Sequence, residues 1–168
     1  MTKLYKSDIT RKGALPMYQK WLRKSQSLFT PPYILLIYRI LNKPTQFLYN
    51  CEISPQATIG EGLYIGHPFG ITINPAVVIG KNCNIHKGLT VGQENRGIRK
   101  GTPKIGNEVW IGVNVTIVGN VKIGDDVLIA PNTYINRDVP SHSVVFGNPC
   151  QIKHKENATE GYINNKTI

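Results

Sequence analysis

The chain has 168 residues, of which 40% are hydrophobic and 18% are charged, and its net charge is +10. This composition is typical of one globular domain with a sizeable core, and it excludes a disordered chain. The three cysteines, Cys51, Cys83 and Cys150, are odd in number and widely separated. They therefore predict neither a disulfide framework nor a metal site, and we expect no bound metal.

The first 48 residues are predicted to form a helical module. Apolar residues recur at roughly helical spacing between residues 15 and 28. Pro31 and Pro32 suit a break that is followed by the first turn of a second helix. We expect this second helix to end near Leu41, with Pro44 closing the module.

Most of the positive charge lies in this module. Residues 1–45 hold nine lysines and arginines against a single acidic residue, Asp8. This excess predicts peripheral contact with an anionic membrane surface. We expect a cytoplasmic protein, because the chain starts without an apolar signal segment and the apolar run 33–41 is far shorter than a membrane span. Nucleic-acid binding is not expected, because the later part of the chain lacks aromatic residues interleaved with positive ones.

From Ile53 onward an aliphatic residue recurs every six positions, usually followed by a small residue. The pattern is clearest where isoleucine stands at six positions in a row: Ile105, Ile111, Ile117, Ile123, Ile129 and Ile135. It slips by two residues after Ile65, and the polar segment 93–103 interrupts it. A period of six fits a mainly β fold, a triangular parallel β-helix in which three hexapeptides make one coil. We expect this β-helix over residues 49–153, followed by a tail over residues 154–168.

Over about residues 50–153 the chain resembles the hexapeptide-repeat acyltransferases, and within them the serine acetyltransferase-like branch and its polysaccharide O-acetyltransferase relatives. The hexapeptides, the His67 segment and the closing run Gly147-Asn148-Pro149 carry this resemblance. It implies a left-handed β-helix and a homotrimer whose active sites lie in clefts between neighbouring prisms. It also implies acetyl-CoA as the acyl donor.

His67 is the candidate general base. It lies in the segment where the repeat slips, so its side chain can leave the regular wall, and the resemblance places the catalytic histidine here. The resemblance also places a carboxylate in the segment of Glu52, where it would orient the imidazole. Glu52 precedes His67 by a little less than one coil, so the two can lie close together. The other open reading is that Glu52 is a solvated residue at the end of the prism.

At two positions the sequence differs from serine acetyltransferases, and both positions concern the molecule that accepts the acetyl group. Gly66 stands where serine acetyltransferases carry an acidic residue for the ammonium group of serine, and Thr102 stands where they carry a second histidine. Losing that carboxylate argues against free serine. We therefore expect a carbohydrate acceptor, a sugar hydroxyl of a surface polysaccharide such as a capsule, with serine O-acetyltransferase as the alternative. A non-enzymatic β-helical scaffold is the remaining reading.

Binding of acetyl-CoA is expected along one edge of the prism. Gly92, Gly112 and Ala130 are predicted to line this edge, where small residues let a pantetheine arm approach the backbone. Trp110 is expected beside it, packing on the cofactor or on a neighbouring subunit. The phosphates are assigned to Arg137 and Lys153. Whether His86 or the basic loop 93–103 takes part in catalysis stays open at this point.

Overall fold

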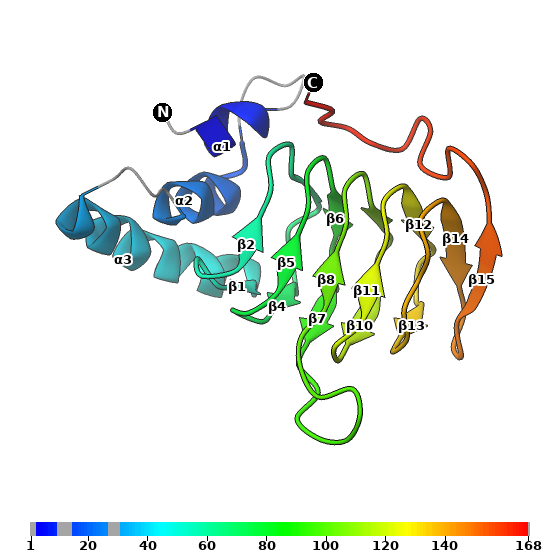
Figure 1. Ribbon diagram of the computed structural model, residues 1–168. Coiled ribbons are helices and arrows are strands. Elements are labelled where there is room, and N and C mark those ends of the chain that lie inside the picture. Colours follow the sequence, from blue (N-terminus) through cyan, green and yellow to red (C-terminus); the bar gives the residue numbers. More distant parts are fainter. Residues whose placement is uncertain (1–2, 10–14, 27–30, 168) are drawn as a thin grey trace.

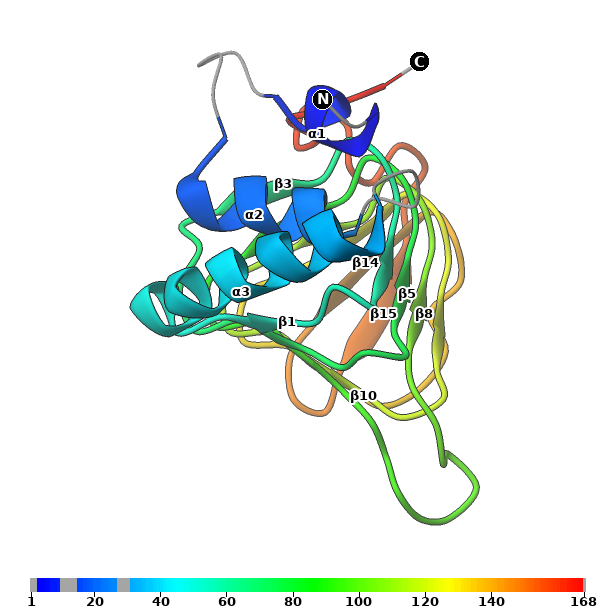
Figure 2. The same ribbon diagram turned by 90° about the vertical axis from the view of Figure 1, so that its left-hand side faces the viewer.

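The computed structural model describes residues 3–9, 15–26 and 31–167, which form three helices followed by a prism of short strands (Figure 1). The helices are α1 (Lys3–Ser7), α2 (Met17–Ser25) and α3 (Pro32–Tyr49). They lie at the end of the prism where the strands begin (Figure 2).

The strands form three sheets, and from β1 to β13 any three consecutive strands belong to three different sheets, whereas β14 and β15 both join the third sheet. The first sheet holds β1 (Glu52–Ile53), β4 (Thr72–Ile73), β7 (Thr90–Gly92), β10 (Thr116–Val118) and β13 (Tyr134–Ile135). The second holds β2 (Thr58–Ile59), β5 (Val78–Ile79), β8 (Lys104–Ile105) and β11 (Lys122–Ile123). The third holds β3 (Tyr64–Gly66), β6 (Asn84–His86), β9 (Trp110–Ile111), β12 (Val127–Ile129), β14 (Ser143–Phe146) and β15 (Gln151–His154). All described pairs of strands are parallel except β14 with β15, so the predicted parallel β-helix is confirmed.

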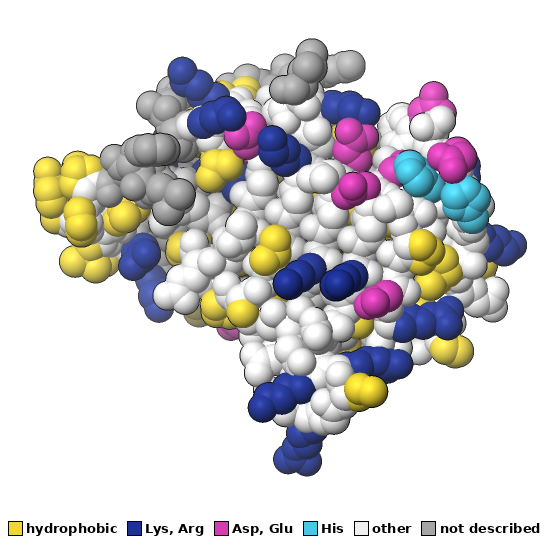
Figure 3. Space-filling model, viewed as in Figure 1, with side chains coloured by type: hydrophobic (Ala, Val, Ile, Leu, Met, Phe, Trp, Pro, Cys, Tyr) yellow, Lys and Arg dark blue, Asp and Glu magenta, His cyan; other side chains and the backbone are white. Residues whose placement is uncertain are grey.

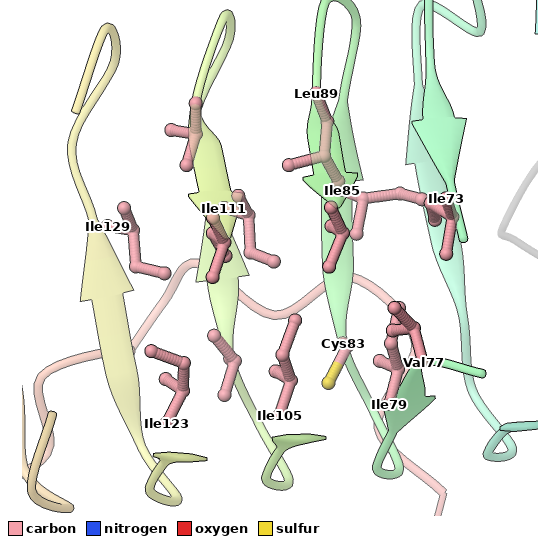
Figure 4. Packing of buried hydrophobic residues seen from close by; sticks show 14 of the residues in the cluster. Ile73, Val77, Ile79, Cys83, Ile85, Leu89, Ile105, Ile111, Ile123 and Ile129 are labelled. Atoms are coloured by element: carbon pink, nitrogen blue, oxygen red, sulfur yellow. The ribbon is translucent and has the colours of Figure 1, made fainter. Parts of the chain in front are cut away.

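The core is the interior of the prism, where each repeat aliphatic stacks on its equivalent one coil away. In the first sheet Ile53 lies opposite Ile73, and Ile73 lies opposite Val91. The six isoleucines of the clearest repeats are all buried, and Figure 4 shows the stacked rows. Because the buried apolar cluster runs from coil to coil, each repeat is stabilised by the coils beside it.

The corners explain the small residue that follows the aliphatic. A Cβ added at Gly60 would lie 2.6 Å from the carbonyl oxygen of Gly80, and one added at Gly80 would lie 2.5 Å from that of Gly106. Backbone therefore stacks directly on backbone there, and no larger residue fits.

α3 is longer than expected. It continues through Pro44 to Tyr49, so the predicted end near Leu41 is wrong. The missing N–H of proline costs little here, because Pro44 and Ile40, whose carbonyl it would have bonded, are both on the exposed side. The helix ends at Asn50 in the left-handed conformation, with φ of 47°. Part of the first expected helix, residues 27–28, lies outside the described residues.

A buried ion pair holds α2 on the first coil. Arg23 and Asp8 are both fully buried, and the Arg23 Nε donates to Asp8 at 2.5 Å. Arg23 also donates to the carbonyls of Ile59 and Gly60. A buried charge is tolerable only with such partners.

The last described residues run back along the prism and reach the neighbourhood of α1 (Figure 1). Asp126 accepts hydrogen bonds from Ala158 and Thr159, and the Asn165 amide donates to the carbonyls of Asp8 and Leu63. We refer to residues 155–167 as the C-terminal strap. Because both the helices and the strap bond to the β-helix, the division of the chain into domains stays a prediction.

Candidate active site

His67 lies in the turn between β3 and β4. This turn is two residues longer than the equivalent turn between β6 and β7 in the next coil, which is the slip seen in the sequence. His67 is exposed and has φ of 52°, a conformation that costs about 1 kcal/mol or more in a residue with a Cβ. Its side chain has no hydrogen-bond or ionic partner in the described part of the chain. The imidazole therefore lies outside the sheets of the prism, where a ligand can reach it.

Glu52 begins β1, and β1 pairs with β4, the strand that the His67 turn leads into. Glu52 lies opposite Thr72, and its N–H donates to the carbonyl of Ile71 at 2.7 Å. Glu52 therefore lies on the strand next to the one that follows the His67 turn. Within the described residues no hydrogen bond or ion pair joins the two side chains, so the proposed dyad is not formed in this conformation.

Glu52 faces a groove between α3 and the first sheet. The groove has a volume of about 590 Å³ and is lined on the helix side by Arg39 and Lys43 and on the sheet side by Glu52, Thr72 and Gly92, among others. His67 is not among its lining residues. In the sequence Arg39 and Lys43 are two of the nine positive residues of the helical module. Their spacing of four residues, which puts two side chains on one helix face, is the signal that identifies them as a pair.

His86 occupies the space above Gly66. Its Nδ1 donates to the carbonyl of Ile111 at 2.7 Å, and its ring lies between those of Tyr64 and Trp110. A Cβ added at Gly66 would lie 2.4 Å from the His86 Cδ2. The imidazole is therefore fixed by packing, and it excludes any side chain at position 66.

The expected donor edge is only partly formed. Gly112 and Ala130 do lie side by side, because Ile111 pairs with Ile129. Gly92 does not join them: it lies opposite Val118 in the first sheet. The predicted place of Gly92 on this edge was wrong. The segment 93–103 replaces an ordinary turn, so the count from Gly92 to Gly112 covers two faces of the prism and not a whole coil.

The small residues at this edge also have a structural cause. The N–H groups of Gly112 and Ala130 donate to the carbonyls of Ile129 and Val145, so these amides are already used within the β-helix. A Cβ at Gly112 would lie 2.7 Å from the nitrogen of Pro131. Packing between coils therefore requires a glycine at position 112, with or without a ligand.

Trp110 packs within its own chain. Its ring lies 4.9 Å from that of His86 and 5.3 Å from that of Tyr162 in the C-terminal strap. The expectation that it contacts the cofactor or a neighbouring subunit gains no support from these contacts, because both described ring partners belong to the same protomer.

Arg137 and Lys153 lie at the far end of the prism. Arg137 donates to the carbonyl of Cys150 at 2.8 Å, and the Lys153 ammonium lies 5.6 Å from the ring centre of Phe146. Phe146 follows Ala130 along the same edge, because Ile129 pairs with Val145. Both cations are exposed and so placed that an anionic group at the end of this edge could reach them.

The segment 93–103 projects from the prism as an arm (Figure 1). Glu94 and Gly101 form an antiparallel bridge at its base, and Ile98 near its tip is 99% exposed. Arg96, Arg99 and Lys100 are exposed on it. Within the described residues no group of three or more His, Cys, Asp or Glu side chains could hold a metal ion.

Comparison with known proteins gives a consistent family. Residues 102–137 match the model described as bacterial transferase hexapeptide (six repeats). A serine acetyltransferase from Arabidopsis thaliana is 39% identical over 105 residues, which are 62% of this chain and 32% of that protein. One from Synechococcus elongatus is 32% identical over 120 residues, 71% of this chain and 49% of that protein. The chain thus spans about a third of the length of the first relative and about half of the length of the second.

Solved structures agree. A serine acetyltransferase from Brucella abortus superposes with a TM-score of 0.76 at 24% identity, covering 93% of this chain and 70% of that one, and this likeness concerns the fold. A serine acetyltransferase in complex with CoA superposes with a TM-score of 0.68 at 26% identity, covering 81% of this chain and 55% of that one. With the repeat, the three-sheeted prism and these matches together, the chain is a member of the hexapeptide-repeat transferase family.

Proposed function

We propose that the chain is an acetyl-CoA-dependent O-acetyltransferase in which His67 acts as general base. The observation that carries this proposal is the His67 turn, which is lengthened by two residues and holds an exposed imidazole without a partner. The names of the relatives and the CoA complex of one structural neighbour support the same chemistry.

In the proposed reaction the unprotonated nitrogen of His67 takes the proton of an acceptor hydroxyl. The hydroxyl oxygen attacks the thioester carbonyl, and the tetrahedral intermediate collapses as the CoA thiolate leaves and receives the proton from the imidazolium. Glu52 would stabilise the imidazolium once ligand binding or a neighbouring subunit brings the two together. Arg137 and Lys153 would bind phosphates of the donor. A homotrimer with sites between its subunits is part of this proposal.

L-serine is the first acceptor to consider. The comparisons favour this alternative over the polysaccharide that the sequence suggested, because the relatives are named serine acetyltransferases. The groove beside Glu52, with the cations Arg39 and Lys43, has groups of both signs, as a zwitterionic amino acid requires.

A sugar hydroxyl is the second candidate, and one observation favours it. The acidic residue that the resemblance implies for serine binding is absent at Gly66, and His86 fills the space that its side chain would need. Thr102, at the position of the implied second histidine, donates its hydroxyl to the carbonyl of Ala76. An ammonium group would therefore find no carboxylate at position 66.

The test is release of CoA from acetyl-CoA, followed with a thiol reagent, with L-serine and with a panel of glycan acceptors. We expect turnover with at least one hydroxyl acceptor and its loss in His67→Ala. His154→Ala is the matched control, because His154 is exposed on β15 and, among the described residues, its side chain pairs only with Glu156 and the ring of His142. Undiminished turnover in His67→Ala would disprove the role of His67, and the preferred acceptor decides between serine and a sugar.

A further inference from the structure

One face of α3 is apolar and exposed. Seven large side chains on this helix are each at least 41% exposed, and we refer to them as the apolar stripe: Tyr33, Leu36, Ile37, Ile40, Leu41, Phe47 and Leu48. Their spacing puts them on one arc of roughly 140° at 100° per residue. Figure 3 shows hydrophobic side chains gathered over α3 at the end of the molecule. An apolar patch of this kind marks a surface with a partner.

The other face of α3 is already occupied. Asn42 and Thr45 are buried, and Tyr38 packs on Trp21 of α2 with ring centres 6.1 Å apart. The helix thus has a docked polar face and a free apolar one. Nothing in the described residues covers the stripe, since its members are exposed along its whole length.

Positive side chains border the stripe on both sides. Arg39 and Lys43 are exposed and stand between the stripe and the groove that they line. On the side of α2, the Lys24 ammonium lies 5.1 Å from the ring centre of Tyr38. An apolar stripe flanked by cations is the pattern of a helix that lies in the plane of a membrane surface.

The charge also argues against a second copy of this chain as the occupant. Asp8 is the only acidic residue among the first 51, and it is buried against Arg23. Two stripes packed face to face would bring the cations of the helices together, and the first 51 residues offer no exposed carboxylate to pair with them. Anionic headgroups supply that missing charge.

We propose that α3 docks on an anionic lipid surface, with the apolar stripe among the lipids and Arg39, Lys43 and Lys24 against the headgroups. The helix does not cross the bilayer: in the described part of the chain no helix is long and apolar enough for that. Docking would place the groove that Arg39 and Lys43 line at the level of the headgroups.

Co-sedimentation of the full chain with vesicles tests this. We expect binding to vesicles that contain phosphatidylglycerol, at least about tenfold weaker binding to pure phosphatidylcholine, and weakening by salt. The double variant Ile40→Asp/Phe47→Asp should bind at least about tenfold more weakly. Ile98→Asp is the matched control, with the same chemical change at an exposed position outside α3, and it should bind like the wild type. Both variants alter exposed side chains, and their unfolding temperatures verify folding.

Two results would overturn the proposal. One is a wild type that fails to bind the anionic vesicles at low salt, or that binds no better than the double variant. The other is that the apolar stripe joins two copies of the chain. In that case light scattering without lipid would give a smaller mass for the double variant than for the wild type, and the wild type would not sediment with vesicles.

Discussion

The imidazole of His86 stands on Gly66, so closely that a Cβ at position 66 would lie 2.4 Å from its Cδ2. The two residues are one coil apart and face each other because Gly66 pairs with His86 in the register of β3 and β6. The size of one side chain therefore limits the other.

Gly66→Asp tests the pair directly. Alone, we expect it to lower the free energy of unfolding by about 1–3 kcal/mol, because the new side chain and the His86 ring cannot share the space. Combined with His86→Ala, the added cost of Gly66→Asp should fall, and turnover of L-serine should rise if an acid at 66 recognises ammonium. Urea unfolding and CoA release with serine measure the two effects. Equal costs of Gly66→Asp with and without His86 would refute the steric account.

Substitutions at His67 should change activity and stability in different ways. Its φ of 52° favours glycine, so His67→Gly should raise the free energy of unfolding by up to about 1 kcal/mol relative to His67→Ala. Both variants should lose roughly 10²- to 10⁴-fold in kcat, as expected for removal of a general base. Thermal unfolding and CoA release are the measurements. A glycine variant less stable than the alanine variant would mean that the turn does not store this strain.

Glu52 is expected to act through His67. Glu52→Gln should lower kcat by roughly tenfold or more with little change in unfolding temperature, because the carboxylate has no partner to lose in the described residues. Glu61→Gln is the control, an acidic side chain on the same coil that pairs with Lys3 at 2.8 Å. If both glutamines leave kcat unchanged, Glu52 is a solvated residue and His67 works without a carboxylate.

The period of six was enough to predict the β-helix, because each buried aliphatic in it has one structural equivalent per coil. The lengthened turn at His67 was also visible, as a slip in that period. The position of Gly92 was not predictable by counting, because the inserted arm hides how many faces of the prism lie between Gly92 and Gly112.

Contacts that depend on folding back in space left no sequence signal. The C-terminal strap was expected to be a tail, yet Tyr162 lies on Trp110 and Asn165 reaches the carbonyl of Asp8. No periodicity or charge pattern indicates such contacts between distant segments. The continuation of α3 past Pro44 was missed because propensity alone disfavours proline within a helix, whereas an exposed site tolerates it.

The buried pair Asp8–Arg23 should dominate the attachment of α2. Asp8→Ala leaves a fully buried guanidinium without its carboxylate, and we expect a loss of about 3–5 kcal/mol in the free energy of unfolding. Lys3→Ala, which breaks an exposed pair with Glu61, should cost less than about 1 kcal/mol. Urea titration distinguishes them. Similar small costs for both would show that water reaches Arg23 when Asp8 is removed.

The C-terminal strap should be less stably attached to the prism both at low pH and above neutral pH. Burial tends to raise the pKa of Asp126, but hydrogen bonds from Thr159, His142 and Ala158 outweigh it and lower that pKa to about 2. A lowered carboxylate pKa gives stability that is full above the unfolded value near 3.9 and is lost as the pH falls towards 2. The hydrogen bond to Asp126 raises the pKa of His142, with Glu156 adding to it. That contribution is full below about pH 6.5 and is lost as the pH rises through the higher folded value.

Hydrogen exchange of the segment 157–167 at several pH values checks this. We expect the strongest protection between about pH 4 and 6.5 and faster exchange on either side. Asp126→Asn should speed exchange of the strap and weaken its dependence on pH on both sides, since it removes the charge that supports His142 and replaces one of the two acceptor oxygens with an amide NH2 group. His142→Gln should weaken the pH dependence of the exchange only on the alkaline side. A strap whose exchange, corrected for the intrinsic rate, does not respond to pH in the wild type would mean that Asp126 does not anchor it.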